Sequence, residues 1–415
     1  MTVFLQYPCR IATHFLLGAC LLIMVGGADW PQFLGPARNG TSVETGLLDT
    51  WGDKGPPQLW EKVVGEGYSS PVVVGERVIL LHRMGDEEVV ECFDATKGER
   101  QWKYAYATSY RDALGKGNGP RSTPAVADGK VFTLGAEGAL VCLELEKGTK
   151  VWSRELLKDY RVKRSYFGVG TSPLVEGDMV LVNVGGKGAG IVAFNKTDGK
   201  EIWKSTDHDA SFSSPVAATI DGTRHVLFFT REGIVSLDPV NGAVRFSVHW
   251  RAKIDASVNA ATPLVVGDQV FVSASYGTGA FLGAIKKDKL EEVWSNDETM
   301  SCHFNTPVYR DGFLYGFDGR EDVGGAVLRC VEMKTGKVRW SKPGFGSGSL
   351  ILVDGKLILL AEDGDLVSLK AIPDKYEELA RAPVLTGPVR AAPALANGRL
   401  YTRDAKKLTC WNLKK

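Results

Sequence analysis

The sequence has no concentration of charge of one sign. Its 415 residues include 50 lysines and arginines against 49 aspartates and glutamates, and neither sign gathers into a long block. Proteins that bind nucleic acid or an anionic membrane surface carry a basic patch or run that is visible at this level. The balanced distribution therefore argues against nucleic-acid partners and against an anionic membrane surface.

Patterns of reactive side chains are also scarce. The six histidines include no pair at metal-ligand spacing, and the seven cysteines include no close pair and no Cys-x-x-Cys-His haem signature. A Gly-x-Ser-x-Gly nucleophile elbow is absent. Segments with helical periodicity are few, whereas short Val, Ile, Leu and Phe runs recur between glycine-containing turns, and glycine reaches 48 residues. These features predict an all-β protein without a ready catalytic or metal site.

Residues 1–28 have the features of a secretion signal. Arg10 precedes the apolar stretch 15–25, which is too short to span a bilayer, and residues 26–28 are small enough for signal cleavage. We therefore expect an exported protein, periplasmic or extracellular, whose mature chain begins near Asp29. No integral membrane span is expected.

A second interpretation of this segment is a lipoprotein. The residues that end at Cys20 resemble a lipoprotein box, which would attach that cysteine to lipid. The apolar stretch continues past Cys20, where a polar tether would be expected, so cleavage without lipidation is the favoured prediction.

A small residue followed by proline recurs along the chain. Successive prolines are 53, 49, 42, 48, 44 and 86 residues apart, and the last interval is a doubled one with Ser349-Leu350 near its midpoint. The chain therefore holds eight units, and a period of this length is typical of β-propellers. The copies are Ser70-Pro71, Thr123-Pro124, Ser172-Pro173, Ser214-Pro215, Thr262-Pro263, Thr306-Pro307 and Ala392-Pro393.

Each unit carries the signals of a four-stranded sheet. A two-residue turn of Gly, Asp or Asn follows the proline, then a third apolar strand and a second turn, which in most units contains glycine. An aromatic residue comes next in every unit except the seventh, and its large apolar area suits the wedge between neighbouring sheets. We expect these residues to dock blades and to take no part in chemistry: Trp60, Trp102, Trp152, Trp203, Phe246, Trp294 and Trp340.

The two ends of the chain are expected to complete one unit. The eighth unit, residues 391–413, ends after its third strand, and a spare strand lies at residues 57–61. Pairing of the two would close the ring and remove open sheet edges. The predicted fold is a single eight-bladed β-propeller of four-stranded blades at residues 57–415, preceded by an N-terminal extension at residues 29–56.

At this point a family resemblance is visible. Residues 94–102 and 332–340 resemble the tryptophan-docking motif of PQQ-like (pyrroloquinoline quinone repeat) β-propellers, and the likeness covers nearly the whole mature chain. The family includes quinone-dependent alcohol dehydrogenases and BamB-like lipoproteins of outer-membrane assembly, which are not catalytic. Residues 29–36 and 118–124 are similar to exported propellers of planctomycete-like bacteria. The resemblance implies the fold, whereas activity has to be argued from the site.

Four of the cysteines fall at one repeated position in the third strand. Because other units have small residues there, we expect a small buried side chain and not a disulfide or a metal ligand. Cys302 departs from the repeat, and the adjacent cysteine pair of some quinone alcohol dehydrogenases is absent. The aligned residues are Cys92, Cys142, Ala193, Ser236, Ala284, Cys330, Ser368 and Cys410.

Binding candidates lie just ahead of the prolines, where the chain enters the inner strands at one end of the channel. Small residues are the background there, so large or polar exceptions are informative. Arg121 and Arg390 among them would favour an anionic guest. The candidates are Tyr68, Arg121, Tyr166, Phe167, Phe212, Asn259, His303, Asn305 and Arg390.

A quinone site of the kind that the resemblance implies needs a calcium ion held by carboxylate and amide oxygens, and an aspartate base. Asn259 and Asn305 could supply amides, and Arg121 or Arg390 could contact the quinone, but no carboxylate occupies the candidate positions. The acids nearby lie in connecting loops and are expected to be solvated: Asp207, Asp209, Asp255, Asp297, Glu298, Asp318, Glu321 and Asp322. We expect no catalytic residue, no metal and no cofactor.

Cys302 beside His303 is one further pair, because a neighbouring imidazole can lower the pKa of a thiol. Adjacent residues on a strand point to opposite faces, which argues against it. The favoured hypothesis is an exported, non-catalytic scaffold that presents loops and a funnel to a protein, a glycan or a small ligand, with an envelope complex as one setting. The alternative is a PQQ- and calcium-dependent alcohol dehydrogenase, including the type that acts on polyvinyl alcohol.

Overall fold

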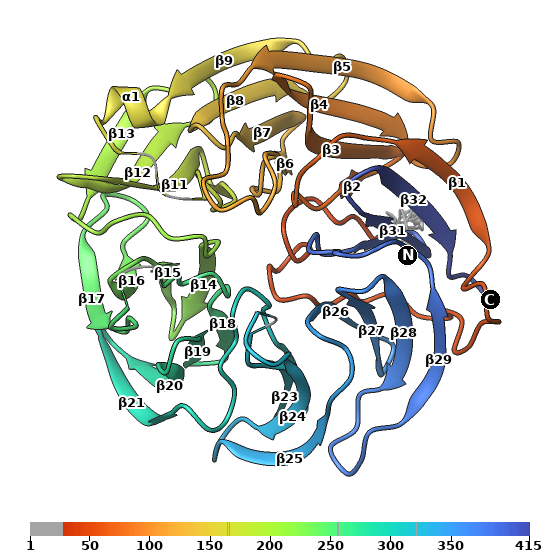
Figure 1. Cartoon of the computed structure of the whole chain (residues 1–415). Coiled ribbons are helices and arrows are strands. Elements are labelled where there is room, and N and C mark those ends of the chain that lie inside the picture. Colours follow the sequence, from red (N-terminus) through yellow and green to blue (C-terminus); the bar gives the residue numbers. More distant parts are fainter. Residues whose placement is uncertain (1–27, 164, 166, 255–256, 321) are drawn as a thin grey trace, which may run out of the picture.

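The structure is a computed structural model that describes residues 28–163, 165, 167–254, 257–320 and 322–415. Residues 1–27 of the expected signal segment, including Cys20, lie outside these residues. Within them, 32 strands form eight four-stranded antiparallel sheets arranged in a ring (Figure 1). The prediction of an all-β, eight-bladed propeller is confirmed.

In blades one to seven the strands follow chain order from the inner to the outer edge, and the eighth blade combines the two ends of the chain. Blades one to four contain β2 (Val72–Val74), β3 (Arg77–Met84), β4 (Glu87–Asp94), β5 (Arg100–Ala107); β6 (Ala125–Ala127), β7 (Lys130–Leu134), β8 (Ala139–Glu144), β9 (Lys150–Glu155); β10 (Leu174–Glu176), β11 (Met179–Gly186), β12 (Ala189–Asn195), β13 (Glu201–Ser205); and β14 (Val216–Ile220), β15 (Thr223–Phe229), β16 (Gly233–Leu237), β17 (Val244–His249). Blades five to eight contain β18 (Leu264–Val266), β19 (Gln269–Ala274), β20 (Gly279–Lys286), β21 (Lys289–Asn296); β22 (Val308–Arg310), β23 (Phe313–Asp318), β24 (Val327–Glu332), β25 (Lys337–Lys342); β26 (Gly348–Val353), β27 (Lys356–Ala361), β28 (Asp365–Lys370), β29 (Glu378–Pro383); and β30 (Ala394–Ala396), β31 (Arg399–Arg403), β32 (Lys407–Asn412), β1 (Gln58–Val63).

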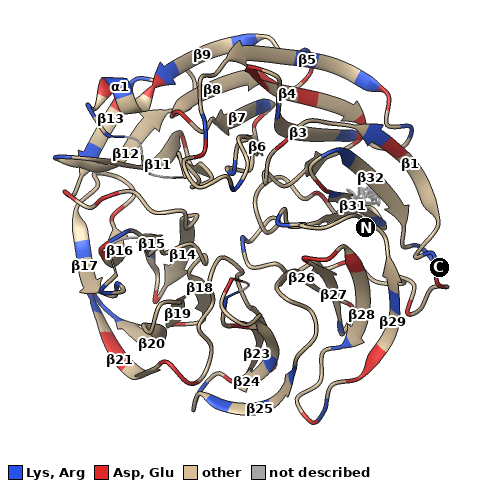
Figure 2. Cartoon of the chain, in the orientation of Figure 1, with Lys and Arg blue, Asp and Glu red and all other residues tan. Residues whose placement is uncertain are grey.

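Burial explains why the middle strands are apolar on both faces. Strands β3 and β4 are buried along most of their length because each blade packs between two others, whereas β5 at the outer edge exposes much of its length. The turns between the first two strands use residues that accept positive φ, such as Asp128 at 49° and Asn397 at 56°. Lys, Arg, Asp and Glu are interspersed around the outer strands (Figure 2).

The docking role of the tryptophans is visible in their hydrogen bonds. Each indole nitrogen donates to a backbone carbonyl of the following blade, so the side chain fills the wedge and also satisfies its one polar atom. The donor and acceptor residues are Trp60 and Ala95, Trp102 and Leu145, Trp152 and Lys196, Trp203 and Pro239, Trp294 and Met333, and Trp340 and Ile372.

The glycine of the second turn lies directly under the tryptophan of the preceding blade. A Cβ on Gly148 would lie 2.4 Å from Trp102, and one on Gly98 would lie 2.7 Å from Trp60. Both glycines also have positive φ, near 67° and 68°. Turn geometry and blade docking therefore require glycine at the same place.

Two blades depart from this pattern. Phe246 takes the docking position in β17 and has no N–H to donate, and in β29 Ala380 lies opposite Ser368 where other blades pair the aromatic. The junction of blades seven and eight therefore lacks an aromatic of this kind.

The predicted place of Ala284 in the cysteine alignment is wrong. Trp294 pairs with Leu282, and Ala284 pairs with Glu291. The alignment assumed that the small residue always lies the same number of residues before the tryptophan. In this blade, β20 and β21 stay paired as far as Lys286 and Lys289, on either side of a tight turn, so the residue opposite Trp294 lies further back in the sequence. The position therefore accepts leucine as well as small residues.

The ring closes as predicted through its eighth blade. Strand β1 pairs antiparallel with β32, and Trp60 lies opposite Cys410. The outer strand of the last blade thus comes from the N-terminal side of the chain, and no sheet edge is left to be filled at the closure.

The N-terminal extension crosses the central channel, which the sequence did not indicate. The Trp30 amide donates to Val73 of blade one, the Val126 amide of blade two donates to Pro31, and the Leu352 amide of blade seven donates to Gly40. Blade eight lies between blades one and seven, so the extension enters the channel beside blades one and two and leaves it beside blade seven (Figure 1).

Arg38 is the centre of this crossing. Arg38 is 2 % exposed, and its guanidinium donates to the Pro215 carbonyl at 2.7 Å, to the Pro173 carbonyl and to Gln32 Oε1 at 2.9 Å. Burial lowers the pKa of Arg38 to about 9, so it remains charged at neutral pH. One buried cation thereby ties the extension to the inner ends of blades three and four.

The single helix of the described residues is α1 (Leu156–Asp159), a short turn after β9. None of the described helical structure is long and apolar enough to cross a membrane.

Candidate functional site

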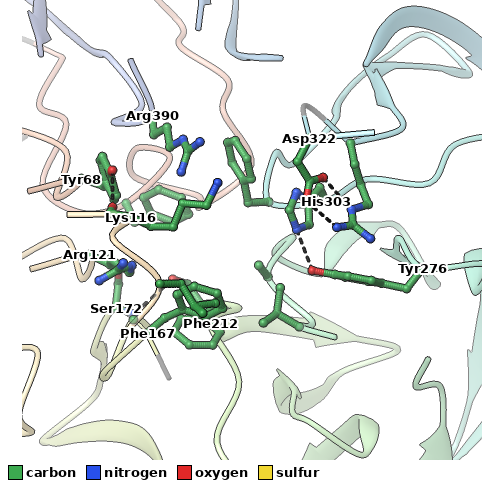
Figure 3. Close-up of a pocket in the computed structure, with 18 of the residues that line it drawn as sticks. Tyr68, Lys116, Arg121, Phe167, Ser172, Phe212, Tyr276, His303, Asp322 and Arg390 are labelled. Carbon is green, nitrogen blue, oxygen red and sulfur yellow. Dashed lines mark hydrogen bonds and ion pairs between the residues drawn. The ribbon is translucent and has the colours of Figure 1, made fainter. Parts of the chain in front are cut away.

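A pocket of about 440 Å³ opens at the end of the channel where the chain enters the inner strands (Figure 3). Gly170, Ser172 and Ser214, which precede β10 and β14, belong to its wall, and Phe33 of the N-terminal extension also lines it. We call this pocket the funnel. Because the extension crosses the channel, it supplies part of the funnel wall through Phe33.

Arg121 forms the most elaborate contact of the funnel. Its guanidinium pairs with the buried carboxylate of Asp112 at 2.7 Å and donates to the Tyr110 hydroxyl at 3.1 Å. It also lies 5.5 Å from the ring centroid of Tyr68 and 5.7 Å from that of Phe167. Burial acts to raise the pKa of Asp112, but amide hydrogen bonds and the Arg121 charge lower it overall, so this carboxylate is ionised at neutral pH.

Arg390 approaches the same tyrosine from another blade. Its guanidinium pairs with Glu362 at 3.2 Å and lies 5.6 Å from the Tyr68 centroid and 5.8 Å from that of Phe304. The Tyr68 hydroxyl donates to the Lys116 carbonyl. Tyr68 is therefore held at its hydroxyl and contacted by two guanidinium groups.

A second cluster forms the other side of the funnel (Figure 3). The Tyr276 hydroxyl and His303 Nε2 are 2.9 Å apart, and the Arg320 guanidinium lies 4.1 Å from the Tyr276 ring centroid. Arg320 bonds both carboxylate oxygens of Asp322, at 2.9 and 2.6 Å. The hydrogen bond from Arg320 lowers the pKa of Asp322. The polar side chains on this side of the funnel are therefore hydrogen-bonded or ion-paired to one another.

The structure brings most of the predicted funnel residues together. Tyr68, Arg121, Phe167, Phe212, His303 and Arg390 all line the pocket. Tyr166 lies outside the described residues. A role in ligand binding remains a prediction for each of them.

Asn259 and Asn305 do not line the funnel, and their amides bond the fold. Asn259 Nδ2 donates to the Thr230 carbonyl at 2.8 Å and to the Trp250 carbonyl at 3.1 Å. Asn305 Nδ2 donates to the Gly348 carbonyl, and its Oδ1 accepts from Ser347 at 2.7 Å. Both are buried, so these residues fix connecting loops in place.

Several funnel residues were missed by sequence reasoning. Most of them lie in connecting loops or in the extension, away from the positions ahead of the prolines. Phe304 stands between the candidates His303 and Asn305, and Asp322 was named only as a solvated loop acid. The intervals of 53, 49 and 48 residues between prolines, against 42 and 44 elsewhere, were a usable signal of enlarged loops. The missed residues are Phe33, Leu114, Lys116, Ile254, Tyr276, Phe304, Arg320 and Asp322.

The five cysteines of the described residues are buried and free. Burial raises the pKa of Cys92 and of Cys302 to about 12, so both thiols are protonated at neutral pH. His303 turns its ring toward Tyr276, and the Cys302 thiol is fully buried. The two neighbours therefore do not form an activated pair.

Each arginine that lines the funnel pairs with a carboxylate: Arg320 with Asp322 in the funnel wall, and Arg121 and Arg390 with Asp112 and Glu362 behind it. In the part of the chain that the structure describes, no three His, Cys, Asp or Glu side chains gather closely enough to hold a metal ion. The arrangement is suited to hold a guest by aromatic and cationic contacts.

A family model described as outer membrane protein assembly factor BamB matches residues 85–342, more than half of the chain. The factor BamB of Shewanella oneidensis is 25 % identical over 359 residues, which cover 75 % of this chain and 88 % of that protein. A quinohemoprotein alcohol dehydrogenase of Pseudomonas putida is 30 % identical over 146 residues, but these cover 33 % of this chain and 19 % of that protein.

Two solved structures with the same architecture come from these two groups of proteins. BamB from Moraxella catarrhalis superposes with a TM-score of 0.62 at 17 % identity, covering 86 % of this chain and 97 % of that one. A quinohemoprotein alcohol dehydrogenase from Comamonas testosteroni gives 0.53 at 14 % identity, covering 93 % and 81 %. At such identities the likeness concerns the fold alone.

Proposed function

The chain belongs to the family described as outer membrane protein assembly factor BamB, and from that membership we propose that it is an exported, non-catalytic scaffold of envelope assembly. In this proposal the ring is a rigid frame. Its connecting loops and funnel bind a partner, and the tryptophan-docked blades keep those loops in one arrangement.

The observation that carries the proposal is the engagement of the funnel's polar groups. Arg121, Arg390 and Arg320 are each held by a carboxylate and stacked near an aromatic ring. Groups fixed in this way are preorganised for binding, because little side-chain freedom is lost when a guest arrives. Recognition is therefore the task that the geometry supports.

The donors present do not fit the calcium ion of a quinone site. Calcium takes several oxygen ligands, mostly carboxylates and carbonyls. Neither Asn259 nor Asn305 lines the funnel, the Asn305 oxygen accepts from Ser347, and the carboxylates at and behind the funnel wall pair with arginines. The local similarity to the Pseudomonas putida enzyme keeps a PQQ-dependent alcohol dehydrogenase as the alternative.

Titration with pyrroloquinoline quinone and calcium separates the two functions. Saturation of a site at a hundredfold excess over its Kd would stabilise the folded protein by about 2.7 kcal/mol. We expect no shift in melting temperature, no new absorbance and no quinone-dependent dye reduction with simple alcohols or polyvinyl alcohol. A clear stabilisation with alcohol-dependent activity would replace the scaffold by the dehydrogenase.

Photo-crosslinking in envelope preparations tests the scaffold directly. A photoreactive residue at Leu114, which is 59 % exposed at the funnel, should crosslink to a discrete envelope protein. The same residue at Leu59, which is 46 % exposed on β1, is the matched control. Equal crosslinking from both sites, or none from Leu114, contradicts the proposal.

A further inference from the structure

A second hollow, of about 790 Å³, adjoins the funnel and is strongly basic. Its described wall includes Arg111, Arg161, Lys163, Lys187 and Arg231, with Asp209 as its acidic residue. We call it the basic groove. The whole chain is nearly neutral, with 50 basic and 49 acidic residues, so this is a local concentration of positive charge.

Three of the cations in the basic groove are available for a guest. Arg161, Lys163 and Lys187 are exposed, and within the described part of the chain their side chains have no ion pair. Arg111 differs, because it pairs with Asp86 at 2.8 Å. Lys116, on the funnel side, is likewise exposed and without an ion pair among the described residues.

The basic groove and the funnel share a wall. Phe167, Phe212 and Val258 line both hollows. The funnel side adds two apolar side chains, Leu114 at 59 % and Ile254 at 54 % exposed. Large exposed apolar side chains beside a pocket mark interaction sites. The joined hollow thus offers an aromatic, apolar pocket next to a row of free positive charges.

We propose that the joined hollow binds an acidic peptide segment of a partner protein, with a bulky apolar side chain in the funnel and its carboxylates along the basic groove. This proposal rests on the scaffold function above and names the chemistry of its partner. Aromatic residues and arginine dominate protein–protein binding energy, and opposite charge at the rim guides the encounter.

A peptide fits these walls better than an acidic glycan does. The funnel rings are four phenylalanines and two tyrosines, and both tyrosine hydroxyls are engaged, Tyr68 with the Lys116 carbonyl and Tyr276 with His303. Sugar hydroxyls need hydrogen-bond partners when they are buried. The exposed hydrocarbon of Leu114 and Ile254 matches an apolar side chain.

The test uses the exported chain and fluorescein-labelled peptides. The probe Gly-Glu-Glu-Phe-Glu-Glu-Gly is compared with a version in which Gln replaces every Glu and with one in which Ser replaces Phe, and oligogalacturonate serves as an acidic glycan. We expect the first probe to bind and each altered peptide to bind about tenfold more weakly. Binding should also weaken with salt, because exposed charges are screened.

Charge reversal locates the site. The double variant Lys163→Glu/Lys187→Glu should weaken the probe about tenfold. Lys147→Glu/Lys334→Glu, which reverses two exposed lysines on the turns after β8 and β24, should leave it unchanged. Leu114→Ser tests the apolar contact between the funnel and the phenylalanine of the probe. The melting temperature of each variant reports whether it stays folded.

Three results overturn this inference. They are equal binding of the Glu and Gln peptides, equal loss in both double variants, and tight binding of oligogalacturonate without binding of the peptide. Each of them leaves the scaffold proposal standing. Stabilisation by pyrroloquinoline quinone and calcium would instead remove the scaffold, so the two failures are distinguishable.

Discussion

The eight blade junctions are closed in two ways. Six of them use a tryptophan that donates to the next blade, as Trp102 does to Leu145, and a seventh uses Phe246. At the junction of blades seven and eight the N-terminal extension joins the blades instead. The Ser42 amide donates to Leu352 in β26 at 2.8 Å, and the Leu48 amide donates to Leu413 after β32 at 2.7 Å.

Charges reinforce this exceptional junction. Lys356 of β27 reaches Asp49 at 2.7 Å, and Lys415 reaches the other oxygen of Asp49 at 2.7 Å. The hydrogen bond from Lys356, followed by that from Lys415, lowers the pKa of Asp49 to about 2. The comparison shows that a repeat protein can replace one missing docking side chain by a segment that does not repeat.

Removing residues 29–62 should have the largest effect, because it deletes the extension and most of β1 together. The deletion exposes β32 as an open edge and leaves the junction of blades seven and eight without its tie. We expect insoluble protein, measured by solubility and gel filtration. A soluble chain of this length with one cooperative melting transition would contradict the closure.

Arg38→Ala should have the next largest effect, and it sharpens the comparison at a single residue. The change leaves the Pro173 and Pro215 carbonyls without their donor and opens a cavity in the channel. We expect the free energy of unfolding to fall by about 3 kcal/mol. The measurement is urea unfolding, with Lys54→Ala in an exposed part of the same extension as control. Equal midpoints would mean that the extension does not brace the ring.

Trp102→Phe should cost less than Arg38→Ala. Phenylalanine keeps most of the apolar contact, as Phe246 does in blade four, but loses the hydrogen bond to Leu145. We expect a loss of about 1–2 kcal/mol. Phe246→Leu is the matched change at a junction without this hydrogen bond. A larger loss from Trp102→Phe than from Arg38→Ala would reverse the ranking of the two kinds of junction.

The sequence predicted the ring because its signals are local and repeated. A turn glycine is needed both for positive φ and for room beneath a tryptophan. Gly148 and Trp102 are therefore two independent sequence signals for the same blade junction. Ring closure was predictable because the last unit of the chain lacks its fourth strand and a spare strand lies near the other end. The residue opposite each docking aromatic could be found by counting along the sequence wherever the second turn had its usual length. The count gave the wrong residue, Ala284, in the blade where that turn is tight.

The site was less predictable because its residues do not repeat. Residues ahead of the prolines, such as Arg121 and Arg390, were found by their position in the unit. Tyr276 and Phe33 reach the funnel from a loop and from the extension, and no periodic signal marks them. Asn259 was chosen for its chemistry, but its amide is used by neighbouring carbonyls, which only three-dimensional contacts reveal.

The smallest expected effect concerns the cysteines opposite the docking aromatics, such as Cys92 opposite Trp102, where blade seven has Ser368 opposite Ala380. Burial raises the pKa of Cys92 to about 12 from an ordinary value near 9. Below pH 9 the thiol is protonated in both the folded and the unfolded state, so its ionisation contributes nothing to the pH dependence of stability. Above pH 9 the unfolded thiol ionises first, and stability falls as pH rises.

Cys92→Ala should therefore change the free energy of unfolding by less than about 1.5 kcal/mol at pH 7, since other blades carry Ala193 or Ser236 at this place. The variant should also lose less stability than the parent between pH 9 and pH 10. In the native state at pH 8 the thiol should resist a disulfide reagent until denaturant is added. Rapid native labelling would show that the wedge beside Trp102 opens, and the tryptophan junctions would then be looser than the one held by the extension.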